Sequence, residues 1–138
     1  MTTTGRLDRQ CGTRRGATAV EFAITAPLFF LLLLAAFEFG WMNVIRHTAD
    51  NAAYEAARQA MVPGATTDEA VGTADRLLSV VGVRDARVTV TPPVLTPDTK
   101  AIKVEIDVPM ISNGLVVPRF TAGKTLHSES TLRTERGE

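Results

Sequence analysis

The sequence predicts an α+β fold: a long N-terminal helix whose first half spans a membrane, a second short helix, and a small three-stranded antiparallel sheet. Three observations lead to this prediction. The hydrophobic residues, 45% of the 138-residue chain, include one uncharged stretch at residues 22–37. Small apolar residues then recur at helical spacing. Further along, apolar and polar residues alternate as they do in strands. A chain of this length has room for one small domain and an anchor.

The uncharged stretch 22–37 is the centre of the expected membrane helix. As a helix it covers about 24 Å, slightly less than the hydrocarbon core of a bilayer. Flanking residues extend the expected transmembrane helix to residues 17–42, which places Glu21 near one edge and Glu38 near the other. Trp41 follows Glu38, at the position where an amphipathic ring suits the lipid–water interface.

The charges before this helix predict its orientation. Residues 1–16 carry four basic side chains and one acidic side chain, which are Arg6, Arg9, Arg14, Arg15 and Asp8. Because basic flanks stay in the cytoplasm, we expect residues 1–16 to be a cytoplasmic leader and residues 43–138 to form a domain outside. A cleaved secretory signal fits less well, because Glu21 interrupts its apolar region and no good cleavage site follows. Gly16 and Glu21 also do not suit a twin-arginine signal.

The helix is expected to continue beyond the membrane. Residues 43–61 contain no proline or glycine, and Pro63 and Gly64 end the pattern. Alanines recur there every three or four residues, so we expect them to share one face of the helix. They are Ala49, Ala53, Ala56, Ala57 and Ala60. This narrow stripe fits either an ordinary helix packed on its own sheet or the spine of a subunit that also meets its neighbours.

A second helix and three strands complete the expected domain. Thr66 and Glu69 form a capping-box pattern, and Gly82 ends the helix that follows. Strands are expected at Arg87–Thr91, at residues 101–108 and at Thr125–Arg133. The last of these alternates with mostly polar residues, which favours a strand at the edge of the sheet.

No pattern in the sequence indicates catalysis or a cofactor. His127 and Glu129 flank Ser128 on an expected strand, where neighbouring side chains point to opposite faces, so the three cannot form a local triad. His47 and Asp50 could touch on a helix, but no nucleophile accompanies them. Two isolated histidines and one cysteine predict no metal site. The balanced charge gives no reason to expect nucleic acid. We therefore expect no enzyme, cofactor or metal.

Glu21 is the informative residue of the apolar region. An acidic side chain costs about 2.5–3.5 kcal/mol at the centre of a membrane helix and less near an edge. One interpretation is that Glu21 only marks the cytoplasmic edge. However, Gly16 lies five positions earlier and directly follows Arg14 and Arg15. No other glycine in the leader has a glutamate at this offset.

Basic residues, a glycine, four small or apolar residues, a glutamate and an apolar helix together resemble the processing site of type IV prepilins. The resemblance implies that a membrane-bound prepilin peptidase cuts between Gly16 and Ala17, leaving Glu21 as the fifth residue of the mature chain. The new ammonium at Ala17 and the carboxylate of Glu21 could then pair, within one subunit or between two.

The same run, followed by Pro27, leucines, Glu38, Phe39 and Gly40, resembles the TadE-like family of minor pseudopilins in tight-adherence (Flp) pilus assembly. This resemblance implies a non-enzymatic inner-membrane subunit that serves adhesion or secretion. The implied partners are membrane lipid, the prepilin peptidase, other pilins or pseudopilins and the pilus assembly platform. Ala17 departs from the methylated phenylalanine usual in type IV pilins, so N-methylation is not carried over. The alternative is an uncleaved single-pass membrane protein whose outer domain binds an envelope partner.

Overall fold

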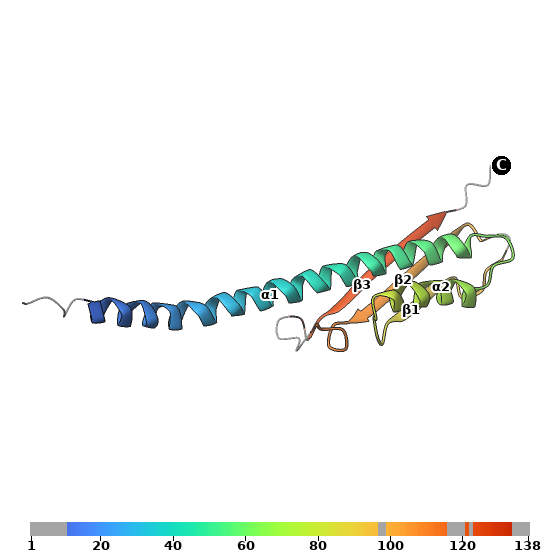
Figure 1. Cartoon of the computed structure of the whole chain (residues 1–138). Coiled ribbons are helices and arrows are strands. Elements are labelled where there is room, and N and C mark those ends of the chain that lie inside the picture. The colour runs from blue at the N-terminus through green and yellow to red at the C-terminus, as the bar shows by residue number, and fades with distance from the viewer. Residues whose placement is uncertain (1–10, 97–98, 116–120, 122, 134–138) are drawn as a thin grey trace, which may run out of the picture. The chain divides into compact units, whose positions relative to one another are not determined.

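A computed structural model describes residues 11–96, 99–115, 121 and 123–133, with side chains described from Gly16 onward. Its elements are helix α1 (Cys11–Ala60), helix α2 (Thr67–Val80), and strands β1 (Arg87–Thr91), β2 (Ala101–Pro109) and β3 (Thr125–Arg133) (Figure 1). The predicted α+β fold is confirmed. Most of the basic leader, including Arg6 and Arg9, lies outside the described residues.

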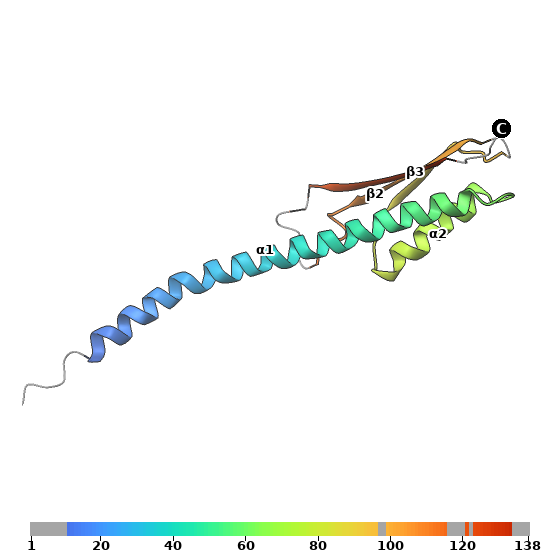
Figure 2. The same cartoon turned by 90° about the horizontal axis from the view of Figure 1, so that it is seen from above.

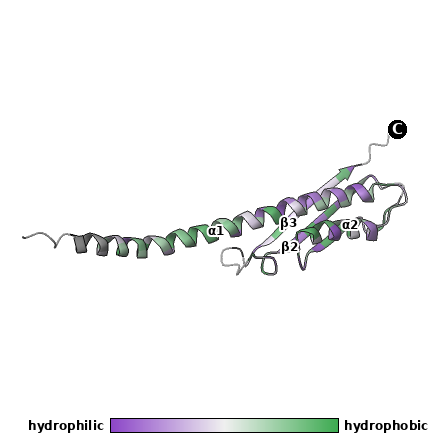
Figure 3. Cartoon of the chain, viewed as in Figure 1, coloured by the Kyte–Doolittle hydropathy of each residue, from purple (hydrophilic) through white to green (hydrophobic). Residues whose placement is uncertain are grey.

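The chain divides into two compact units, Met1–Ala36 and Phe37–Glu138, and α1 contributes to both. In the first unit, the described residues belong to α1, with Pro27 inside the helix. The hydrophobic colouring in Figure 3 is concentrated on this part of α1. The second unit, which we call the head, contains the rest of α1 and all the other elements.

The sheet of the head has the strand order β1-β2-β3, and both pairs of strands are antiparallel. In the centre of the register, Val104 of β2 lies opposite Val90 of β1 and Ser130 of β3. β3 is thus at an edge, as its polar alternation predicted. Helix α2 and the later part of α1 cover one face of this sheet (Figure 2).

The core of the head lies between these helices and the sheet. The alternating residues of β2 point into it and are at most 2% exposed, namely Ile102, Val104, Ile106 and Val108. The expected alanine stripe of α1 faces them and is at most 4% exposed, with Ala52 as an additional member. Because alanine has no side chain beyond Cβ, the helix can lie close to the sheet without leaving a cavity.

Both ends of α2 follow from local chemistry. The Thr66 hydroxyl accepts a hydrogen bond from the Glu69 amide at 3.3 Å, and the Glu69 carboxylate accepts one from the Thr66 amide at 3.0 Å. This is the predicted capping box. Gly82 follows the helix with a φ of 71°, a left-handed conformation that glycine adopts without steric cost.

Candidate functional site

The expected processing segment lies within α1. Gly16 and Ala17 are exposed, and a Cβ atom at Gly16 would meet nothing within 4 Å. Packing within the described chain therefore does not require a glycine at this position. The backbone of Arg14 and Arg15 belongs to the same helix, but their side chains lie outside the described part.

Glu21 is exposed on the next turn of the helix. Its backbone carbonyl accepts a hydrogen bond from the Thr25 hydroxyl at 2.9 Å. Among the described residues, no cationic side chain pairs with its carboxylate. Ala17 precedes Glu21 by four residues, which places the two positions on the same face of a helix, one turn apart. The helix thus brings the two predicted partners to neighbouring positions, while the rest of the described chain offers Glu21 no ion pair.

The surface of α1 around and beyond Glu21 is apolar and uncovered. Large side chains are exposed on every side of the helix, including Phe22 (71%), Ile24 (70%), Leu28 (60%), Phe29 (62%), Leu32 (62%) and Phe37 (57%). Within the described residues, α1 is long and apolar enough to cross a membrane, and its most apolar stretch is entirely unburied. A helix that is apolar all round needs either a membrane or protein to cover it.

Glu38 has a different environment, because it is buried in the head. Its carboxylate accepts hydrogen bonds from the Thr121 amide at 2.9 Å and from the Thr121 hydroxyl at 2.6 Å. Thr121 itself is fully buried. The charge at the end of the apolar stretch is therefore satisfied by the segment that leads into β3.

Trp41, one turn after Glu38, is connected to the segment that follows β2. Its indole Nε1 donates a hydrogen bond to the Asn113 carbonyl at 2.9 Å. The buried Asn113 amide bonds the backbone of Arg84, donating at 2.8 Å and accepting at 2.7 Å, and donates to the Pro109 carbonyl at 2.7 Å. Asn113 thus joins α1, the turn after α2 and the end of β2.

We call Glu38, Trp41, Asn113 and Thr121 the junction. Sequence reasoning missed it, because the hydrogen-bonded pairs are separated by 83 and 72 residues. Glu38 looked like a membrane-edge glutamate, and Asn113 lies in an irregular segment without periodicity. The only local signal was the presence of a carboxylate and an indole directly after an apolar run.

Among the described residues, no contact of His47 or Asp50 on α1 points to catalysis. The carboxylate of Asp50 accepts a hydrogen bond from the hydroxyl of Ser128 at 2.6 Å, which joins α1 to β3. Ser128 therefore contacts α1 from the inner face of the sheet. His127 and Glu129 point to the other face, as strand geometry predicted.

The solvent-facing side of the sheet carries a network of charges, Lys103, Glu105, Asp107, His127 and Glu129, which we call the outer-face network. The Lys103 ammonium lies 2.6 Å from Glu105 and 2.9 Å from Glu129. These hydrogen bonds raise the pKa of Lys103 and lower the pKa of Glu129. The Asp107 carboxylate, 2.8 Å from Nδ1 of His127, raises the pKa of the imidazole.

Part of this network has the composition of a metal-ligand set, which sequence reasoning did not find. Possible ligand atoms of Glu105, His127 and Glu129 lie within 4.8 Å of one another. However, Lys103 already binds both glutamates, and the residues are exposed or half-buried. A cation would have to displace Lys103. The arrangement is therefore that of a solvated cross-strand charge network.

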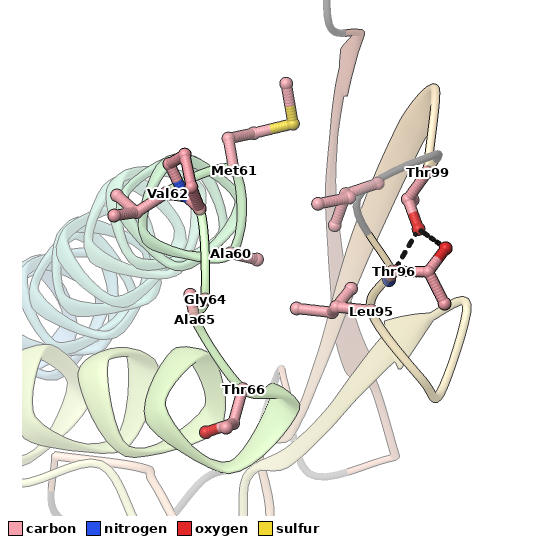
Figure 4. Close-up of a pocket in the computed structure, with 11 residues that line it drawn as sticks. Ala60, Met61, Val62, Gly64, Ala65, Thr66, Leu95, Thr96 and Thr99 are labelled. Atoms are coloured by element: carbon pink, nitrogen blue, oxygen red, sulfur yellow. Dashed lines mark hydrogen bonds between the residues drawn. The ribbon is translucent and has the colours of Figure 1, made fainter.

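An open pocket of about 300 Å³ lies at the other end of the head from the junction, between the turn after α1 and the loop after β1. Figure 4 shows Leu95, Thr96 and Thr99 across from the turn that contains Gly64. The Thr96 amide donates to the Thr99 hydroxyl at 2.9 Å. Among the described residues, those that line the pocket carry no ionisable side chain.

Comparison with known proteins finds a similarity for one segment of the chain, residues 16–58. No curated protein and no solved structure matches the chain. Residues 16–58 match the family described as TadE-like protein. The match begins at Gly16, includes Glu21, the exposed apolar surface and Glu38, and ends within the alanine stripe. Residues 16–58 of this chain are therefore similar to the TadE-like family.

Proposed function

We propose that this protein is a minor pseudopilin, a non-enzymatic component in the assembly of a tight-adherence pilus or a related secretion system. Residues 1–16 are the cytoplasmic leader, residues 17–42 cross the inner membrane, and residues 43–138 form a pilin-like domain outside. A prepilin peptidase removes the leader between Gly16 and Ala17. Other pilins or pseudopilins and the assembly platform are its partners.

The observation that carries this proposal is the TadE-like match, which starts at Gly16 and continues along α1. Its residues include a helix surface that is apolar on all sides and that the rest of the described chain leaves uncovered. Such a surface suits both a bilayer and neighbouring helices, the two environments that a pilin subunit passes between.

The local structure also suits cleavage. Gly16 and Ala17 are exposed and lie near the N-terminal end of α1, where helices fray most readily. A peptidase that binds an extended substrate therefore needs to open only the beginning of the helix. Because a Cβ atom at Gly16 would meet nothing within 4 Å in the described chain, packing there does not explain the glycine, whereas recognition by a peptidase would.

The experiment is N-terminal sequencing of the chain co-expressed with an active prepilin peptidase. We expect the mature protein to begin at Ala17, and Gly16→Leu to abolish the cut because the peptidase requires a small residue before the bond. Gly12→Leu, a substitution in the same leader, is the matched control and should still be processed. A wild-type product that begins at Met1 would favour the uncleaved membrane protein, and one that begins after Ala36 would indicate a secretory signal.

A further inference from the structure

Asn113 is followed by Gly114, and the other two asparagines of the chain are followed by valine and alanine. In an Asn-Gly pair the backbone nitrogen of the glycine can attack Cγ of the asparagine, because glycine has no Cβ to obstruct the approach. A five-membered succinimide ring forms and ammonia leaves. Water then opens the ring and gives aspartate or isoaspartate, so the net reaction consumes one water and releases one ammonia.

In the fold, the side chain of Asn113 is engaged in a way that opposes this reaction. Its amide nitrogen donates hydrogen bonds to the Arg84 carbonyl at 2.8 Å and to the Pro109 carbonyl at 2.7 Å. Its amide oxygen accepts a hydrogen bond from the Arg84 amide at 2.7 Å. The nitrogen that would leave as ammonia is therefore the atom that makes two of these bonds, and Asn113 is only 6% exposed.

An aspartate could not take the place of this amide. A carboxylate oxygen would replace the amide nitrogen opposite the carbonyl oxygens of Arg84 and Pro109, so that acceptor would face acceptor at both contacts. Isoaspartate would also lengthen the backbone by one carbon. The site therefore accommodates the amide and excludes both products of its deamidation.

The same residue joins its segment to α1. The backbone carbonyl of Asn113 accepts the hydrogen bond of the Trp41 indole at 2.9 Å. Its backbone amide donates to the Met110 carbonyl at 3.2 Å, which closes the turn at the end of β2. Local opening that separates this turn from α1 and from Arg84 is thus the motion that would free the asparagine side chain to react.

We propose that Asn113 and Gly114 form a latent deamidation site that the junction protects. While the turn stays bonded to Trp41 and Arg84, the amide is retained. When the turn separates, Asn113 is converted to aspartate or isoaspartate and these contacts do not re-form. The modification makes an opening of the junction permanent, and this inference does not depend on the proposed function.

The first test follows deamidation of the full-length protein in detergent at mildly alkaline pH, by mass spectrometry of the peptide that contains Asn113. Trp41→Phe removes the indole donor and keeps an aromatic ring. Tyr54→Phe is the matched control, because Tyr54 is 50% exposed on the same helix. We expect Asn113 to react several-fold more slowly in the folded wild type than in guanidinium, and several-fold faster in folded Trp41→Phe than in Tyr54→Phe. Equal rates in the folded and unfolded wild type, or in the two folded variants, would overturn the inference.

The second test examines the product. Trp41 is the only tryptophan, so quenching of its fluorescence by acrylamide reports whether the turn covers it. We expect Asn113→Asp to be quenched several-fold more than the wild type. Asn51→Asp, the same chemical change at an exposed position of α1, should match the wild type. Equal quenching in all three would show that the contacts accept a carboxylate and would overturn the permanence of the opening. If Asn113→Asp does not fold, the deamidation rates of the first test still decide whether the junction protects the site.

Discussion

Glu21 lies on a helix surface that is otherwise mostly apolar, and among the described residues no cationic side chain pairs with its carboxylate. Glu38, at the other end of the same apolar stretch, is buried and bonded twice to Thr121. The carboxylate of Glu21 therefore needs a cationic partner from outside the described residues of a single chain. The carboxylate of Glu38, by contrast, already accepts hydrogen bonds within the head of its own chain.

Replacing Glu21 by alanine tests whether it pairs with the new N-terminus during assembly. We expect Glu21→Ala to insert and to be cut after Gly16, but to crosslink poorly to its pilin partners. Loss of one member of a buried ion pair costs about 3–5 kcal/mol, less where water still reaches, and even about 1.4 kcal/mol is tenfold in association. Glu21→Gln, which keeps the size and removes the charge, should behave in the same way. Equal crosslinking yields at equal membrane abundance would leave Glu21 as a mere marker of the bilayer edge.

Replacing Glu38 by alanine should instead weaken the head. The buried amide and hydroxyl of Thr121 would lose their acceptor, and an unsatisfied buried donor costs about 1–3 kcal/mol. Glu38→Gln keeps a carbonyl oxygen as acceptor and serves as the matched control. We expect thermal unfolding of the full chain in detergent to occur at a lower temperature for Glu38→Ala than for Glu38→Gln. Identical transitions for wild type and Glu38→Ala would contradict a structural role for this contact.

At the scale of elements, periodic segments could be predicted and irregular ones could not. The alanines of α1 and the alternating residues of β2 follow the periods of helix and strand, so their buried faces were evident from the sequence. The capping box of α2 was equally local. The connection between β2 and β3 has no period, and its contacts with α1 join residues distant in the chain. Gly16 and Glu21 could be singled out from the sequence, and their roles stay predictions, whereas the junction could be found only from the fold.

The sheet should show a pH dependence that originates in the outer-face network. The pKa of His127 is raised by Asp107, so its contribution to stability is complete below the ordinary value of about 6.5 and is lost as the pH rises through the raised pKa. The pKa of Glu129 is lowered by Lys103, so its contribution is complete above about 4.5 and is lost as the pH falls through the lowered pKa. Both contributions are therefore complete between about pH 4.5 and 6.5.

Titration of the His127 ring, followed by NMR, provides the measurement. Asp107→Asn removes the carboxylate whose hydrogen bond contributes most to the raised pKa of His127, so this pKa should fall toward its ordinary value. Asp68→Asn, at an exposed carboxylate of α2, is the control and should leave it unchanged. The same pKa for His127 in both variants would mean that Asp107 does not interact with it in solution.

At the scale of the whole molecule, one helix belongs both to the proposed anchor and to the core of the head. α1 extends from Cys11 to Ala60, and the boundary between the two compact units falls after Ala36. This boundary comes before residue 42, where the sequence placed the end of the membrane helix. Glu38 and Trp41 already belong to the head by their contacts. The end of the membrane span itself stays a prediction.

The orientation of the chain can be tested with reporter fusions. We expect alkaline phosphatase fused after Glu138 to be active, because the arginines at positions 6, 9, 14 and 15 retain the leader in the cytoplasm. The same reporter fused after Gly16, before the apolar stretch, should be inactive. Activity of the second fusion with inactivity of the first would reverse the proposed topology.

The alanine-rich contact between α1 and the sheet has a consequence for the entropy of folding. Burying a leucine or isoleucine costs about 0.5–1 kcal/mol in lost rotamers, whereas an alanine has none to lose. The six buried alanines of α1, Ala49, Ala52, Ala53, Ala56, Ala57 and Ala60, can therefore join the core almost free of this cost. The same surface has no rotamers with which to adapt, so a larger side chain at any of these positions would have to displace the helix or its neighbours.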